Sequence, residues 1–199
     1  MKKKPVFIFS LVASSLFLIS VMFGQKYWSD LWLIYALIQI GLFLLFLTSV
    51  VWGIIYYGRK NKEQGNIAFL PVLINTIFLS LIIFLPLNKI SNRAGFIIHK
   101  NMYNTAANEA LTKEMGRDGI PKLYKLPKEY RSLSVGGGEV LVLGKGASKG
   151  VLFYTFRGTP EGKSGFLKIN EKGEIGSLAI YLNAEVEELG DNWYFVVGD

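Results

Sequence analysis

The chain has 199 residues with no cysteine and one histidine, and 51% of its residues are hydrophobic. The lack of cysteine excludes disulfides, thiolate metal sites, iron–sulfur clusters and cysteine nucleophiles. The formal net charge of +7 is divided between residues 1–87, which carry +5, and residues 88–199, which carry +2. The basic excess therefore belongs mostly to the apolar part of the chain. Because no basic face with interleaved aromatic residues stands out, nucleic acid is not an expected partner.

Three apolar segments, at about 6–23, 31–57 and 67–87, dominate the first part of the chain. A helix needs about 20 apolar residues to cross a bilayer, and none of the three contains Asp, Glu, Lys, Arg or His. We therefore predict a three-helix transmembrane domain over residues 1–87 and an extracytoplasmic α+β domain over 88–199. A basic start before an apolar run is also typical of a signal peptide. Because VMFGQ at residues 21–25 has no small-x-small cleavage site, we expect a retained helix, with a cleaved signal as the alternative.

Basic residues predict which way the helices run. Lys2, Lys3 and Lys4 precede the first segment, and a second group, Arg59, Lys60 and Lys62, lies between the second and third segments. Loops rich in lysine and arginine remain in the cytoplasm. We therefore expect a multi-pass protein of the plasma membrane, with its N-terminus and the 58–66 loop in the cytoplasm and the C-terminal domain outside.

Each apolar segment contains two adjacent polar residues at a similar distance from its inner end. At a rise of 1.5 Å per residue, all three pairs lie roughly 12–14 Å from the cytoplasmic side. The sequence thus predicts an intramembrane polar layer centred on Asn75, made of Ser14, Ser15, Thr48, Ser49, Asn75 and Thr76. We interpret it as interhelical hydrogen bonding worth on the order of 1 kcal/mol per contact, with a solute or proton path as the alternative. Gln39 lies nearer the outer side and needs another partner.

Residues 88–199 have the composition of a water-soluble domain. Phe96, Tyr103, Ala107, Ala110 and Leu111 share one stripe, which predicts a helix at about 96–115. Short β-type runs with Gly, Pro and Asn between them then predict an antiparallel sheet, because the connections are too short for crossover helices. The predicted strands are Lys122–Leu126, Arg131–Val135, Glu139–Leu143, Val151–Arg157, Gly165–Ile169, Gly176–Leu182 and Trp193–Val197. One sheet packed on the helix is the expected fold, and a sandwich or barrel is the alternative.

The charge of this domain is uneven, with +7 over residues 88–158 and −5 over residues 159–199. We expect the two halves to pair within one fold, and binding of the basic half to anionic lipid is the alternative. The acidic cluster, interpreted as a solvated edge rather than a calcium site, consists of Glu185, Glu187, Glu188 and Asp191.

The motifs predict no catalytic residue, no cofactor and no metal site. Gly162, Lys163 and Ser164 suggest a phosphate loop, but Arg157 occupies the position of its first glycine and a strand is predicted where a helix is needed. His99 is the lone histidine and is interpreted as a solvated helix residue.

We therefore predict a non-catalytic integral membrane protein that displays an extracytoplasmic domain for protein interaction, in an accessory, sensing or immunity-type role. The expected partners are membrane lipid and a protein partner or a second copy of the chain. One alternative is a subunit of a membrane transport complex acting through the polar layer. A second is an extracytoplasmic enzyme in which Glu139 converges with Glu185 or Glu187.

Overall fold

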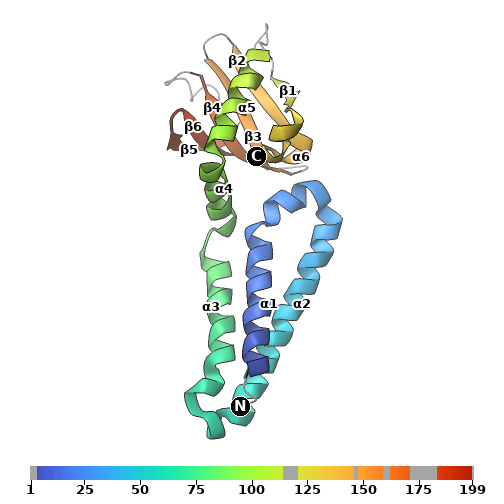
Figure 1. Ribbon diagram of the computed structural model, residues 1–199, viewed down its shortest axis with the longest axis vertical. Coiled ribbons are helices and arrows are strands. Elements are labelled where there is room, and N and C mark those ends of the chain that lie inside the picture. The colour runs from blue at the N-terminus through green and yellow to red at the C-terminus, as the bar shows by residue number, and fades with distance from the viewer. Residues whose placement is uncertain (1–3, 114–120, 146–147, 159–161, 171–182, 199) are drawn as a thin grey trace. The chain divides into compact units, whose positions relative to one another are not determined.

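The computed structural model describes residues 4–113, 121–145, 148–158, 162–170 and 183–198. The chain divides into two compact units, unit 1 (Met1–Ser91) and unit 2 (Asn92–Asp199). Helices lie in the N-terminal part and an antiparallel sheet in the C-terminal part (Figure 1), so the predicted α+β layout is confirmed. The predicted strand Gly176–Leu182 falls outside the described residues.

Unit 1 contains three helices that all pack against one another, and a 3₁₀ turn, η1 (Gly65–Phe69), precedes the third. The helices are α1 (Lys4–Met22), α2 (Gly24–Gln64) and α3 (Leu70–Phe84). Two helical stretches of the described chain, Pro5–Met22 and Leu31–Phe84, are long and apolar enough to cross a membrane. The sequence predicted three spans. The structure gives two stretches because the turn η1 joins α2 directly to α3, so the second stretch contains two of the predicted segments, although the backbone leaves the helical conformation at Gly65 (φ 55°, ψ −136°).

The connections between the predicted spans are largely helical. Helix α2 already begins at Gly24, is kinked at Leu31 (φ −139°, ψ 44°), and continues through most of the 58–66 segment. An ion pair between Lys60 and Glu63 (2.7 Å), three residues apart, supports this last part of the helix. Helix α3 ends where Leu85 turns extended (φ −98°, ψ 136°), since a proline, here Pro86, disfavours the helical conformation in the residue before it.

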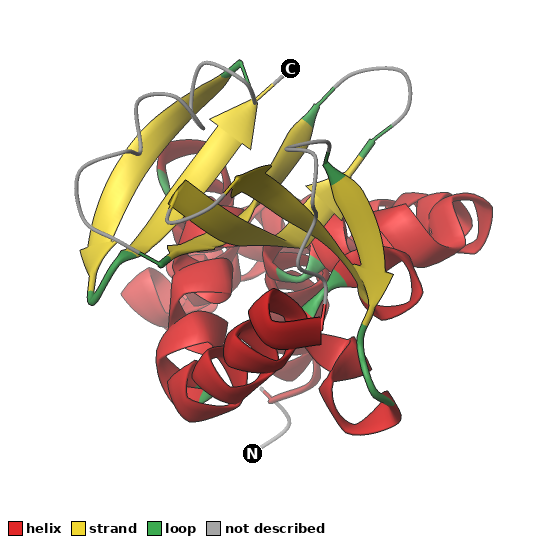
Figure 2. Ribbon diagram, turned by 90° about the horizontal axis from the view of Figure 1, so that it is seen from above, coloured by secondary structure: helices red, strands yellow, loops and turns green. Residues whose placement is uncertain are grey.

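Unit 2 is built on an antiparallel sheet (Figure 2), in which the described residues form six strands in the order β1-β2-β3-β4-β6-β5. Two helices precede it, α4 (Leu87–Ile98), which includes the unit boundary, and α5 (Lys100–Lys113). A 3₁₀ helix, η2 (Lys128–Leu133), and a short turn, α6 (Val135–Gly138), lie between the first two strands. The strands are β1 (Lys122–Lys125), β2 (Glu139–Lys145), β3 (Ser148–Arg157), β4 (Lys163–Ile169), β5 (Ala184–Gly190) and β6 (Trp193–Gly198).

Three sequence predictions need correction. The single helix at 96–115 is two helices that meet at His99, although backbone hydrogen bonds cross the join on both sides of that residue. The predicted strand Arg131–Val135 is wrong: a 3₁₀ turn follows Pro127, and three glycines with φ of 76°, 77° and 82° then turn the chain into β2. Strand β5 was missed because its glutamates were interpreted as a solvated edge. It is an outer strand of the described sheet, where charged side chains are tolerated.

The core of unit 2 is an aromatic cluster between the sheet and the helices. Phe96 stacks on Phe166 with ring centroids 4.6 Å apart, and Tyr103 packs edge-on against Phe153. The Tyr103 hydroxyl donates to the backbone oxygen of Leu133 (3.0 Å), and burial raises the pKa of Tyr103 above its usual range, so the phenol remains a neutral donor. The other sheet face is also apolar and buried; its members include Leu143, Leu152, Leu167, Ile169 and Val196.

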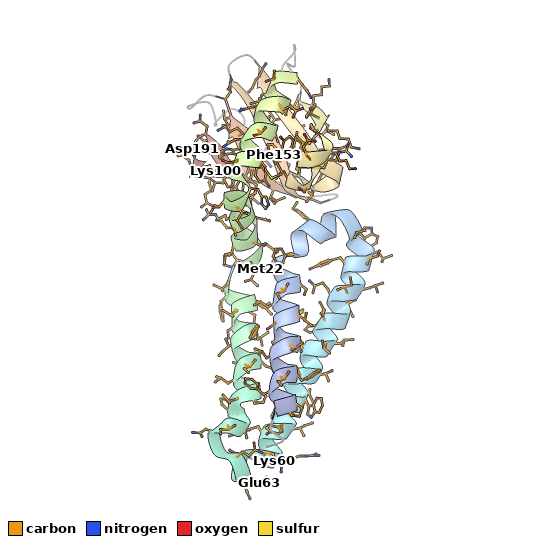
Figure 3. All side chains as sticks on the ribbon, viewed as in Figure 1. Met22, Lys60, Glu63, Lys100, Phe153 and Asp191 are labelled. Atoms are coloured by element: carbon orange, nitrogen blue, oxygen red, sulfur yellow. The ribbon has the colours of Figure 1, made fainter. Side chains whose placement is uncertain are left out.

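Ion pairs join the basic and acidic halves of unit 2, as the charge distribution led us to expect. Arg93 on α4 pairs with Glu187 on β5. Lys100 on α5 pairs with Asp191 at 2.6 Å, and Figure 3 shows these two side chains together at one side of the sheet. Both pairs are partly exposed, so each contributes at most about 1 kcal/mol to stability, and their main effect is to fix which end of the sheet the helices contact.

Gly165 is the tightest point of the sheet, because a Cβ there would lie 2.1 Å from the Phe153 backbone oxygen. We predict that Gly165→Ala destabilises unit 2 by about 2–3 kcal/mol through overpacking. Gly95→Ala is the matched control, since a Cβ on this helical residue meets nothing within 4 Å, and it should be neutral or slightly stabilising. Urea unfolding of the full chain in detergent, followed by circular dichroism, measures both. Equal stability of the two variants would contradict the packing described.

Candidate functional site

The buried polar residues of unit 1 meet at one carboxamide. The hydroxyl groups of Ser14 on α1 and Ser49 on α2 both donate to Oδ1 of Asn75 on α3, at 2.8 Å and 3.1 Å. Both serines are 0% exposed and Asn75 is 3% exposed. These three residues, the polar node, therefore connect all three helices by hydrogen bonds. The node carries no ionisable side chain.

The other residues of the predicted polar layer do not join the node. Thr48 and Thr76 are exposed, and their hydroxyls donate to backbone oxygens of their own helices, those of Leu44 and Val72. Ser15 is half-buried beside Ser14. Consecutive residues on a helix lie about 100° apart, so when one member of each pair faces the neighbouring helices, the other faces away.

Two residues next to the node were missed by sequence reasoning. Gly53 lies one turn beyond Ser49 on α2, and a Cβ there would be 3.4 Å from Cβ of Pro71 and 3.5 Å from Nδ2 of Asn75. Ser10, one turn before Ser14, is 0% exposed. Their spacing of four residues from the node serines is the signal that predicts the shared helix face. Among the described residues, neither Ser10 Oγ nor Asn75 Nδ2 has a hydrogen-bond partner.

Gln39 finds its partners in a second polar cluster. Its side chain bonds the Ser20 hydroxyl (3.1 Å) and donates to the Tyr35 hydroxyl, which in turn donates to the Ser20 backbone oxygen (2.7 Å). Gly24 leaves room for the tyrosine, since a Cβ there would lie 2.5 Å from its hydroxyl oxygen. An apolar groove of about 290 Å³ adjoins this cluster and is lined by Ile19, Ser20, Phe23, Leu31, Ile34, Tyr35 and Ile38.

The outer surface of unit 1 is apolar, while its interior contains small and polar side chains beside a few larger ones, such as Phe46 at 2% exposed. Trp32 and Leu37 are each 63% exposed, and Phe84 is 80% exposed. In contrast, the fully buried positions of the three helices include Ala13 together with the serines of the node. Water-soluble domains bury large apolar side chains and rarely expose contiguous apolar surface of this extent. Small and polar residues at helix contacts are typical of helices packed in lipid.

Those residues predicted to set topology that the structure describes lie at one end of unit 1. Lys2 and Lys3 are outside the described residues, and Lys4 is the first residue of α1. Arg59, Lys60 and Lys62 lie in the last turns of α2, where Figure 3 shows Lys60 close to Glu63. Phe9 and Trp52 pack with ring centroids 5.4 Å apart, which brings the start of α1 beside the last part of α2. The start of α1 and the basic end of α2 therefore lie at the same end of the bundle.

The carboxylates considered for catalysis do not converge. Glu139 on β2 pairs with Arg157 on β3 (2.9 Å), whereas Glu187 on β5 pairs with Arg93. Three strands lie between β2 and β5 in the described sheet, which separates them by roughly 19 Å at about 4.8 Å per step. His99 is exposed, with its Nδ1 2.9 Å from the Gly95 backbone oxygen. The described part of the chain holds no cluster of three or more His, Asp or Glu able to bind a metal ion.

No protein-family model, no curated protein and no solved structure matches this chain.

Removing the shared acceptor of the polar node should loosen the bundle. We predict that Asn75→Ala destabilises unit 1 by about 1–2 kcal/mol, because Ser14 and Ser49 each lose an interhelical hydrogen bond. Thr76→Ala, one residue further on, is the control, and it should change stability by less than about 0.5 kcal/mol because that threonine is exposed. Unfolding of both variants by sodium dodecyl sulfate in mixed micelles provides the measurement. If the two substitutions have equal effects, the node does not hold the helices together.

Proposed function

We propose that this chain is an integral membrane protein whose three helices (1–87) are embedded in lipid and whose C-terminal α+β unit is displayed outside the cytoplasm to bind a partner protein. The observation that carries the proposal is the inverted packing of unit 1, with large apolar side chains outside and the Ser14–Asn75–Ser49 node inside. In water, each exposed Leu or Ile side chain forgoes about 1.5–3 kcal/mol of burial, and a surface made of such residues would aggregate. In hydrocarbon the same surface is solvated.

The first helix supports retention of the N-terminal segment in this proposal. Helix α1 packs against both α2 and α3 and supplies Ser14 to the node. A cleaved signal would leave Asn75 and Ser49 without their third member and would expose the α2–α3 surface that α1 covers. The gathering of basic residues at one end supports a cytoplasmic placement of that end under the positive-inside rule.

Reporter fusions test both insertion and orientation. Alkaline phosphatase, active only outside the cytoplasm, should be active when fused after Asp199 and inactive when inserted after Lys62. A cytoplasm-specific fluorescent reporter at the same two positions should give the reverse pattern. The chain should stay in the membrane pellet after extraction at high pH. Release into the supernatant would contradict the embedded helices, and the opposite reporter pattern would contradict the orientation.

The displayed unit offers two mixed apolar and charged edges to a partner. On β1, Leu123 is 45% exposed between Lys122 and Lys125, and on β5, Val186 is 36% exposed between Glu185 and Glu187. Each of these strands has one sheet neighbour in the described sheet. Apolar contacts surrounded by charge are typical of protein interfaces, and the opposite charges of the two edges allow the partner's contact surface to be located.

Charge reversal of one edge at a time tests the interaction role. The full chain is purified in mild detergent from its native membrane beside two variants, Lys122→Glu/Lys125→Glu and Glu185→Lys/Glu188→Lys. We expect a stoichiometric partner with the native chain and its loss with one variant, because reversed charge repels an electrostatically matched surface. The other variant controls for expression and folding. The absence of any stoichiometric partner from the native sample would contradict the proposal. Binding of the partner by both variants would also contradict it, because the interaction would then involve the helices rather than the strand edges.

A further inference from the structure

Helix α4 carries an apolar stripe that points away from the core of unit 2. Ile97 and Ile98 are 71% and 75% exposed, more than any other large hydrophobic side chain in the described part of unit 2. Ile90 and Ala94 are also exposed. The offsets of four, seven and eight residues from Ile90 place all four side chains within about 100° of the helix surface.

The orientation of this stripe is fixed by Phe96. Its ring is 4% exposed, stacks on Phe166 and packs against Tyr103 and Trp193, so this face of the helix cannot turn without removing Phe96 from the aromatic core. Arg93, on the same side of the helix as Phe96, pairs with Glu187. Because Ile97 and Ile98 follow at about 100° and 200° from Phe96, both must face outward while unit 2 is folded.

The charge and position of α4 point to lipid as the occupant of the stripe. The twelve residues LNKISNRAGFII contain no acidic residue that anionic headgroups would repel, and Glu187 neutralises Arg93 on the opposite side of the helix. The helix begins three residues after Phe84, and the side chains of Ile83, Phe84 and Leu85 are themselves exposed. The apolar surface that ends α3 is thus followed directly in the chain by an amphipathic helix. An exposed apolar stripe on an amphipathic helix without acidic residues suits a helix that lies in the plane of a membrane surface.

We infer that Ile90, Ala94, Ile97 and Ile98 insert into the boundary between headgroups and acyl chains, so that α4 is an interfacial helix. This inference rests on the proposed membrane insertion of unit 1. It assigns unit 2 a lipid-binding surface separate from the strand edges proposed for the protein partner. It also explains why large isoleucines are kept on the outside of an otherwise well-buried unit.

The natural absence of cysteine allows a direct test by spin labelling of single-cysteine variants. Ile97→Cys and Ile98→Cys are labelled separately in the full chain and reconstituted into vesicles of phosphatidylcholine and phosphatidylglycerol. Collision with apolar oxygen is compared with collision with a water-soluble nickel chelate. Thr105→Cys, exposed on α5, is the control for water, and Leu37→Cys, exposed on α2, is the control for the bilayer interior.

We expect the oxygen-to-nickel ratio at positions 97 and 98 to be several-fold higher than at 105 and lower than at 37. If the oxygen-to-nickel ratio at positions 97 and 98 equals that at 105 while position 37 lies in lipid, the interfacial helix is overturned. The proposed membrane insertion of unit 1 is unaffected by that result. An immobilised label shielded from both reagents indicates a protein contact and also overturns the inference. A water-like ratio at position 37 removes the proposed function and the inference together.

Discussion

The hydrogen bonds from Ser14 and Ser49 to the Asn75 carboxamide are the interaction on which the helical unit depends. In the proposed lipid environment, hydrocarbon offers no hydrogen bonds, so a polar side chain that faced outward would have no partner beyond its own helix. Turned inward, one acceptor serves two donors from two different helices. Small neighbours such as Gly53 allow the helices close enough for this geometry. The node therefore fixes rotation and depth of the helices, which apolar contacts with lipid leave undetermined.

Unit 2 has the opposite arrangement, which is the one expected of a unit surrounded by water. Its buried positions hold the largest side chains, Trp193, Phe153 and Phe166 among them, and its charges lie outside in pairs. The indole of Trp193 donates to Asn104 Oδ1 (2.9 Å), so even the polar atom of this core residue is satisfied. The two units thus have opposite packing patterns, which fits the proposed placement of unit 1 in lipid and of unit 2 in water.

Helix α4 lies where the two patterns meet in the sequence. One of its faces supplies Phe96 to the aromatic core, while the opposite face presents isoleucines outward. A helix in water would normally place polar residues on that second face. The exposed isoleucines are explained if this part of the chain still contacts lipid.

The sequence predicted those features that depend on long apolar runs or regular alternation. The helices of unit 1 and strands β2, β3, β4 and β6 follow directly from such patterns. The strand predicted at Arg131–Val135 is wrong although its apolar and polar residues alternate. A 3₁₀ turn follows Pro127, and the glycines after Val135 adopt positive φ. The sequence predicts a polar layer of six residues because the position of a residue in the sequence gives its depth along a helix but not the direction in which its side chain points. That direction depends on how the helices pack. The packing turns Ser49 and Asn75 inward and leaves Thr48 and Thr76 on the outside.

The measurement that tests the inverted packing most directly is a single-cysteine spin-label scan of α2 over residues 44–55 in lipid vesicles. Oxygen accessibility should oscillate with a period of about 3.6 residues. Its minima should fall at Phe46, Ser49 and Gly53, which face the other helices, and its maxima at the exposed positions Leu44, Leu47, Val51 and Ile55. Minima at the leucines, or high accessibility to the water-soluble nickel reagent throughout, would show that this helix does not turn its apolar face to lipid.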